Sequence, residues 1–196
     1  MSMDEGHPFI KALGKIFGGD SDEQKQEEKM EDEIIQMVSE GHEQGAIDAQ
    51  EAKMISNIME FDDKLASEVM THRKNIVAFD VEMPLREIAQ NMADNPYSRY
   101  PVYENDVDNI VGILHIKDVF KSLLACPEGK KVQDVMRKPY YVPETQNISH
   151  LFREMKNNSQ HLAIVIDEYG QTAGVISMED ILEEIVGNIL DEYDVD

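Results

Sequence analysis

Groups that form covalent or metal cross-links are scarce in this sequence. Its one cysteine, Cys126, has no second thiol with which to form a disulfide or a thiolate metal site within the chain. A reducing compartment is therefore the simplest expectation. Apolar runs are short as well, and none approaches the roughly 18–20 apolar residues of a membrane-spanning helix. The first residues lack the apolar core and small-residue cleavage site of a secretory signal, so we expect none.

Basic residues are few, because 18 Lys and Arg stand against 40 Asp and Glu, for a formal net charge of −22. Such a surface repels nucleic acid and anionic lipid, so no nucleic-acid partner is expected. An anionic ligand would need a local arginine, a helix N-terminus or a divalent cation to overcome this repulsion.

Catalytic motifs are missing from the sequence. It contains no H-E-x-x-H, no G-x-S-x-G, no Walker loop and no cysteine paired with a histidine in a recognisable pattern. Nothing here argues for catalysis, and we expect a binding protein that is not an enzyme.

Two segments come before the main part of the chain. Residues 1–29 hold a short amphipathic start, "FIKALGKIFGG", and an acidic linker. The amphipathic start is typical either of a terminus that docks on a core or of a membrane-surface segment. Residues 30–65 have apolar residues at helical spacing, and Asp48 with Glu51 forms a capping box. This pattern predicts a helical hairpin in which Ile55 and Ile58 belong to a buried stripe.

The remainder is an internal repeat. "VGILHIKDVF" at 111–120 matches "AGVISMEDIL" at 173–182, and the two glycines, like the two aspartates, are 174 − 112 = 180 − 118 = 62 residues apart. Val69-Met70 and Val135-Met136 open the two copies. A constant spacing of this kind is typical of a duplicated unit.

Each copy has the pattern β-α-β-β-α over about 60 residues, which is small for an independent core. We therefore expect an α+β fold in which motif 1 (66–126) and motif 2 (132–190) pack about a pseudo-twofold axis, preceded by the helical hairpin. The second copy would complete the core of the first.

The repeat resembles a tandem of cystathionine-β-synthase (CBS) domains, a Bateman module. "SRYPVY", "HLAIVID", "VGILHIKD" and "AGVISMED" carry this resemblance, together with the two Val-Met pairs. The longer stretches around them, with the upstream "EGHEQGAIDAQEAKMISNIMEFDD", are similar to the CorC, hemolysin C and cyclin-M group. That resemblance implies a role in magnesium and cobalt efflux. In many members a transmembrane domain precedes this region and a small domain follows it, so the chain is either a fragment or a shortened relative.

Ser177 and Asp180 form the strongest candidate site. Their spacing is that of a helix N-cap, and capping by itself would explain both residues. The resemblance implies a second role, since the Ser/Thr-x-x-Asp motif of nucleotide-binding CBS domains holds the ribose. A carboxylate can accept hydrogen bonds from both ribose hydroxyls. The expected ligand is an adenosine nucleotide, with Mg²⁺-ATP favoured and its Mg²⁺ held through the phosphates.

Other candidates would complete this site or form a second one. Arg99 would meet the phosphates, unless it pairs with a surface acid. The rest of the predicted nucleotide contacts are Tyr97, Ser98, Pro101, Val142, Pro143 and Val175. His115 and Asp118 take the equivalent places in motif 1, but His115 is not the usual hydroxyl residue, so we rank this second site lower.

The sequence therefore predicts a regulatory adenosine-nucleotide-binding module of a CorC-like magnesium and cobalt efflux protein. It would form a homodimer, act in the cytoplasm or at the cytoplasmic face of a membrane, and work with a transporter domain in cis or in trans. The alternative is a constitutive dimerisation or partner-binding scaffold with a vestigial nucleotide site. Which nucleotide binds, which ion moves and the sign of regulation stay open.

Overall fold

The computed structural model describes residues 23–126 and 130–187. The chain divides into two compact units, one of residues 1–63 with 183–196 and one of residues 64–182. Most of the predicted amphipathic start, including "FIKALGKIFGG", lies outside the described residues.

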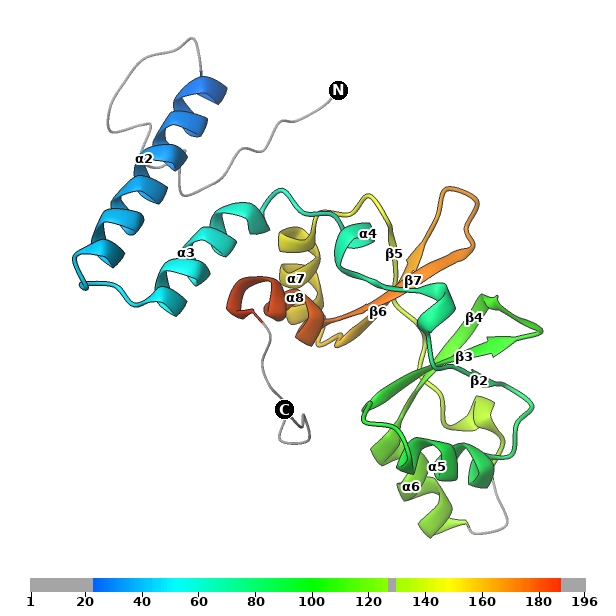
Figure 1. Cartoon of the computed structure of the whole chain (residues 1–196). Helices are drawn as coiled ribbons and strands as arrows, with labels where there is room; N and C mark the ends of the chain where they lie inside the picture. The colour runs from blue at the N-terminus through cyan, green and yellow to red at the C-terminus, as the bar shows by residue number, and fades with distance from the viewer. Residues whose placement is uncertain (1–22, 127–129, 188–196) are drawn as a thin grey trace. The chain divides into compact units, whose positions relative to one another are not determined.

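The first unit contains the predicted helical hairpin. Helix α2 (Glu23–Glu43) and helix α3 (Ala49–Phe61) are in contact and joined by a short turn (Figure 1). The predicted capping box is confirmed: the Glu51 N–H donates to Asp48 Oδ1 at 2.8 Å, and the Asp48 N–H donates to Glu51 Oε2 at 2.9 Å. The predicted buried stripe is wrong at Ile58, whose side chain is 51% exposed, because too few side chains pack over this part of the apolar face of α3.

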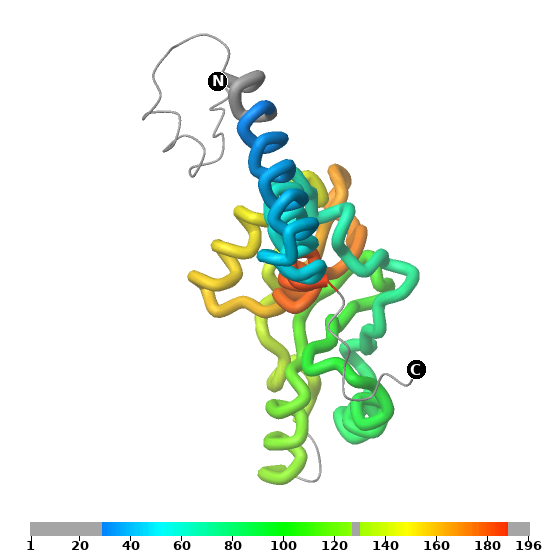
Figure 2. Tube along the Cα trace, turned by 60° about the vertical axis from the view of Figure 1, so that its left-hand side comes forward, coloured from blue at the N-terminus to red at the C-terminus, as the bar shows by residue number. Residues whose placement is uncertain are grey.

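The second unit holds the two motifs. Motif 1 begins with three short elements and continues through the predicted order β-α-β-β-α. Its elements are α4 (Ala66–Val69), β1 (Thr71–His72), η1 (Arg73–Asn75), β2 (Phe79–Asp80), α5 (Leu85–Ala93), β3 (Arg99–Glu104), β4 (Asp106–His115) and α6 (Ile116–Ala125). Helices α5 and α6 lie side by side at one end of this unit in both views (Figures 1 and 2).

Motif 2 repeats this order. Its elements are η2 (Val132–Asp134), β5 (Tyr141–Pro143), α7 (Ile148–Asn157), β6 (Leu162–Ile166), β7 (Thr172–Ser177) and α8 (Met178–Val186), the last of which extends into the first unit. The repeat predicted from sequence therefore folds twice into the same arrangement, and the α+β class is confirmed.

The leading segment of each motif pairs with the sheet of the other motif. The sheets have the orders β1-β7-β6-β5 and β2-β3-β4, so β1 of motif 1 is a strand of the motif 2 sheet. Thr71 pairs with Val175, and Arg137 forms the equivalent bridge with Ile113. Thr71 follows Met70 as Arg137 follows Met136, so the exchange is reciprocal, as a pseudo-twofold axis requires.

The repeated Met and Gly residues allow the exchanged segments to pack closely against the sheets. A Cβ at Gly174 would lie 2.5 Å from Met70 Sδ, and a Cβ at Gly112 would lie 2.8 Å from Met136 Cγ. Each strand glycine thus makes room for the methionine that opens the other motif. This close approach is a reason for glycine within a strand, where it otherwise weakens the ladder.

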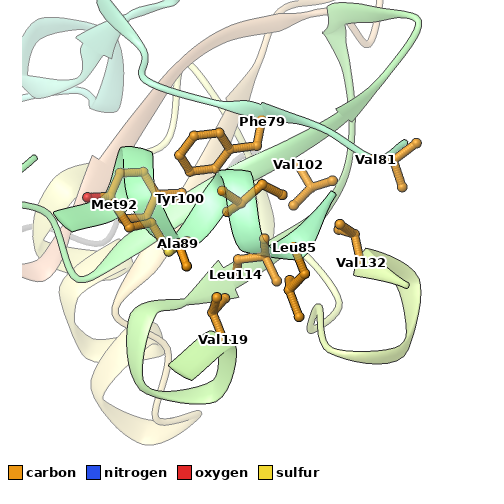
Figure 3. Close-up of a cluster of buried hydrophobic side chains, with 11 residues drawn as sticks. Phe79, Val81, Leu85, Ala89, Met92, Tyr100, Val102, Leu114, Val119 and Val132 are labelled. Carbon is orange, nitrogen blue, oxygen red and sulfur yellow. The ribbon is translucent and has the colours of Figure 1, made fainter. Parts of the chain in front are cut away.

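Motif 1 has a continuous apolar core between its sheet and its helices. Tyr100, Leu114 and Ile88 are fully buried there, from a strand, the paired strand and α5 respectively. Figure 3 shows their neighbours Phe79, Val102 and Val119 converging on the same space. The regular spacing of apolar residues on α5 and α6 provides the helix faces that cover this sheet.

A second apolar cluster joins the two sheets. Ile110 and Ile113 of β4 pack with Leu162 and Ile164 of β6, all at most 8% exposed. The Thr172 hydroxyl also donates to the Asp108 carbonyl at 3.2 Å. The two motifs therefore share a core, which explains why a unit of about 60 residues occurs in duplicate.

Candidate functional site

Helix α8 starts with the predicted pair of side chains. The Asp180 N–H donates to Ser177 Oγ at 3.0 Å, and the Ser177 N–H donates to Asp180 Oδ2 at 2.7 Å. This is a reciprocal capping box, so the capping role is confirmed. Both residues are half-buried. A carboxylate has about four acceptor positions, and this cap uses one of them, which leaves an acceptor on each oxygen for a ligand.

Helix α6 starts differently at the equivalent place. His115 Nδ1 accepts from the Lys117 N–H at 3.0 Å, so the histidine serves as the N-cap in place of a hydroxyl. Asp118 Oδ2 accepts from Arg137 Nε at 2.9 Å and from Arg137 Nη2 at 2.6 Å. One oxygen of this carboxylate is therefore engaged twice by a guanidinium of the same chain.

Positive charge gathers around His115 in an otherwise acidic chain. Burial is the main cause that lowers the pKa of the His115 imidazole below its usual value, and Arg99 lowers it next. Arg137 and Lys117 lower this pKa further, whereas Asp118 raises it. A lowered pKa favours the neutral imidazole, the form whose Nδ1 can accept the capping hydrogen bond.

The segment predicted to meet the phosphates lies beside this helix start. Arg99 pairs with His115 across β3 and β4, and the Ser98 carbonyl accepts from the Ile116 N–H at 3.0 Å. Arg99 is half-buried and has no salt bridge to any described acid. No described hydrogen bond joins Ser98 or Arg99 to Ser177 or Asp180, so their predicted shared site stays a prediction.

Tyr97 and Pro101 differ in their surroundings. Tyr97 is 53% exposed, and its ring meets that of the buried Tyr100 edge-on, with centroids 6.0 Å apart. Pro101 is buried within β3. Tyr97 is therefore accessible to a ligand, whereas Pro101 contributes to the fold.

The last three of the predicted nucleotide contacts, Val142, Pro143 and Val175, come from two strands of the motif 2 sheet. Val142 is buried and pairs with Val165, while Pro143 is exposed in the same edge strand. Val175 is half-buried and packs against the cluster between the sheets. Of these, Pro143 is accessible, and Val142 is a core residue.

No group of three or more His, Cys, Asp or Glu among residues 23–126 and 130–187 could hold a metal ion. Within the same ranges, no helix has both the length and the apolar character to cross a membrane.

Arg137 was missed by the sequence reasoning. The repeat does contain a pattern that distinguishes Arg137. When Met70 is aligned with Met136, Arg137 stands opposite Thr71, so one copy has a charged residue where the other has a neutral one. The partner, Asp118, could not be read from this alignment because it lies on another element.

Comparison with known proteins identifies the repeat. The family profile for the CBS domain matches residues 66–125 and 132–187. The CBS domain of a bacterial CNNM/CorC family Mg²⁺ transporter superimposes with a TM-score of 0.74 at 37% identity, covering 82% of this chain and 98% of that one. This chain belongs to the CNNM/CorC family and contains its CBS pair.

Another solved CNNM/CorC CBS domain is in complex with ATP. It is 39% identical, with a TM-score of 0.66, and the alignment covers 71% of this chain and 99% of that one. Nucleotide binding is thus a property of a near relative of this CBS pair.

Curated relatives are longer than this chain. The YugS protein of Bacillus subtilis is 39% identical over 97% of the chain and 46% of its own length. The magnesium and cobalt efflux protein CorC of Vibrio cholerae is 33% identical over 95% of the chain and 62% of its own length. The chain spans about half the length of YugS and under two thirds of CorC.

Proposed function

We propose that this chain is the regulatory module of a magnesium and cobalt efflux protein and binds an adenosine nucleotide, with Mg²⁺-ATP as the favoured form. The observation that carries the proposal is the start of α8, where Asp180 is fixed by Ser177 yet keeps an acceptor on each carboxylate oxygen. The 39% identical CBS domain in complex with ATP supports the choice of ligand.

The proposed binding mode assigns a role to each group. Asp180 accepts hydrogen bonds from the two ribose hydroxyls, and the first N–H groups of α8 add a favourable dipole. Arg99, which has no described acid partner, supplies positive charge for the phosphates. Mg²⁺ bound to the phosphates lowers the charge that must approach a chain of net charge −22. Tyr97 and Pro143 are the accessible groups for the base.

The module regulates through binding and does not turn its ligand over. Nucleotide can shift an equilibrium between two packings of the module by its difference in affinity for them, and that difference would reach a transporter domain in cis or in trans. Such a module would lie at the cytoplasmic face of the membrane. Incubation with ATP should yield neither ADP nor AMP.

Self-association is part of the proposal. The outer face of α6 carries Phe120, 42% exposed, and Leu124, 85% exposed, next to Ile116. Exposed apolar patches of this kind mark contact surfaces, and we assign this one to a homodimer. Sedimentation should give a dimer mass for the chain, and Leu124→Asp should lower it to that of the monomer.

The melting temperature tests the nucleotide proposal directly. At a ligand concentration a hundredfold above the dissociation constant, binding adds about 2.7 kcal/mol, which corresponds to roughly 5–10 °C for a chain of this size. AMP, ADP and ATP are compared with and without Mg²⁺. Asp180→Asn should abolish the shift, whereas Glu179→Gln, which removes the same charge from the neighbouring exposed residue, should retain it.

The contrary result would favour the scaffold. In that case the chain melts at the same temperature with every nucleotide at millimolar concentration and still forms a dimer. Ser177 and Asp180 would then serve only as a helix cap. Arg99→Ala gives a second check, since loss of charge should weaken ATP more than AMP.

A further inference from the structure

The two helix starts differ in one charged contact, although the fold makes them equivalent. Val175 lies 180 − 175 = 5 residues before Asp180, and Ile113 lies 118 − 113 = 5 residues before Asp118. Thr71 pairs with Val175, whereas Arg137 bridges Ile113. Thr71 and Arg137 therefore occupy matching places in the two sheets, and Arg137 reaches the carboxylate of its helix start.

Arg137 changes what its carboxylate can accept. A cis-diol that donates one hydrogen bond to each carboxylate oxygen needs a free acceptor on both, and both acceptor positions of Asp118 Oδ2 are taken by Arg137 Nε and Nη2. Asp180 Oδ2 accepts a single N–H, from Ser177. The guanidinium also brings a positive charge into direct contact with the Asp118 carboxylate.

We propose that Arg137 acts as an internal plug that closes the motif 1 carboxylate to nucleotide, so that the module takes one nucleotide, at Asp180, where the fold provides two equivalent helix starts. The inference rests on the proposed function for its ligand. It makes Arg137 the residue that sets the stoichiometry, and Thr71 the residue that leaves the Asp180 site open.

The reciprocal exchange of these residues tests the proposal. Calorimetric titration of the full chain with Mg²⁺-ATP and with AMP measures the number of nucleotides bound. His115→Ser combined with Arg137→Thr gives the Asp118 helix start the serine and the threonine that stand at the matching places of the Asp180 helix start, and a second equivalent of nucleotide should bind. Adding Asp118→Asn to that variant should remove the second equivalent again.

The opposite exchange should close the site that is open. Thr71→Arg places a guanidinium beside Asp180, and nucleotide binding should weaken at least tenfold while the melting temperature without ligand is unchanged. Two exposed neighbours give matched controls: Lys138→Thr removes one positive charge next to Arg137, and Asn75→Arg adds one near Thr71. Both controls should bind one nucleotide, as the parent chain does.

The outcomes separate this inference from the proposed function. If the parent binds one nucleotide, lost in Asp180→Asn, and the His115→Ser, Arg137→Thr variant still binds one, the plug is refuted and the proposed function stands. If the parent binds none and that variant binds one, the plug is supported and the proposed Asp180 site fails. If neither binds, both are refuted. If Arg137→Thr by itself weakens ATP binding in the parent, Arg137 contacts phosphate and is not a plug.

Discussion

Gly112 and Gly174, which lie against the exchanged segments, should tolerate substitution by alanine unequally. A Cβ at Gly174 would lie 2.5 Å from Met70 Sδ and 2.6 Å from the carbonyl oxygen of Thr71. A Cβ at Gly112 would meet three atoms of the Met136 side chain, of which Cγ is at 2.8 Å. A thioether side chain can rotate away, but Thr71 is held in the ladder with Val175.

The magnitudes follow from two opposing effects. Alanine restricts the unfolded chain and stabilises by about 0.4–1 kcal/mol where the native backbone permits it, whereas overpacking costs about 1–3 kcal/mol. Gly112→Ala lies at the low end of that cost, for a net loss of roughly 0–1 kcal/mol. Gly174→Ala lies at the high end, for a net loss of about 2 kcal/mol, or roughly 4–8 °C in melting temperature for a chain of this size.

Urea unfolding followed by circular dichroism measures both variants, with the slope checked against the parent. Met136→Ala should remove most of the cost of Gly112→Ala, because it removes the two closest conflicting atoms, Sδ and Cγ, and leaves only Cβ at 3.0 Å. Met70→Ala should leave most of the cost of Gly174→Ala, because the Thr71 carbonyl remains. Equal losses for the two glycine variants, or full rescue of Gly174→Ala by Met70→Ala, would refute this reasoning.

Three further predictions concern single positions. The pKa of His115 is lowered in the folded state, so on acidification the unfolded chain binds a proton first, and the free energy of unfolding falls as the pH drops below about 6.5 until the folded imidazole is also protonated. His115→Asn, which still caps α6, should lose this part of the pH dependence. Superimposable curves of unfolding free energy against pH for the parent and the variant would contradict this. Asn147 caps α7 by accepting from the Ser149 and His150 N–H groups at 3.0 and 3.1 Å, so Asn147→Ala should cost about 0.5–2 kcal/mol in urea unfolding while Asn147→Asp costs little. Ile164 is fully buried between the sheets, so Ile164→Ala should cost about 2–5 kcal/mol, and a loss under 1 kcal/mol would show that the sheets do not share a core.

Features that depend on neighbours in the chain were predictable. The capping boxes of Asp48 with Glu51 and of Ser177 with Asp180 each span three residues, so their hydrogen bonds form as soon as a helix starts there. The repeat likewise fixed the order β-α-β-β-α in both motifs, because its period and its apolar spacing are written in the sequence. The α+β class and the family therefore followed from the residues and their resemblance.

The apolar stripe of α3 shows the limit of such patterns. Helical spacing places Ile58 on an apolar face, but spacing says nothing of what covers that face, and the side chain is 51% exposed. His115 is the opposite case, in which the structure shows a contact that the residue pattern does not predict. Histidine is not the usual hydroxyl residue at this place, yet its position before α6 lets the imidazole accept the capping hydrogen bond.

Pairing between distant segments was decided by the tertiary structure. A duplicated sequence lets each leading segment pair with its own motif or with the other, and local patterns are the same in both cases. The packed fold selects the exchange, joining Thr71 to Val175 across 175 − 71 = 104 residues and bringing Arg137 onto Asp118. The two aspartates at equivalent helix starts thereby differ in their open acceptors, because Asp118 Oδ2 accepts twice from Arg137 of the other motif, whereas Asp180 Oδ2 accepts from the Ser177 N–H.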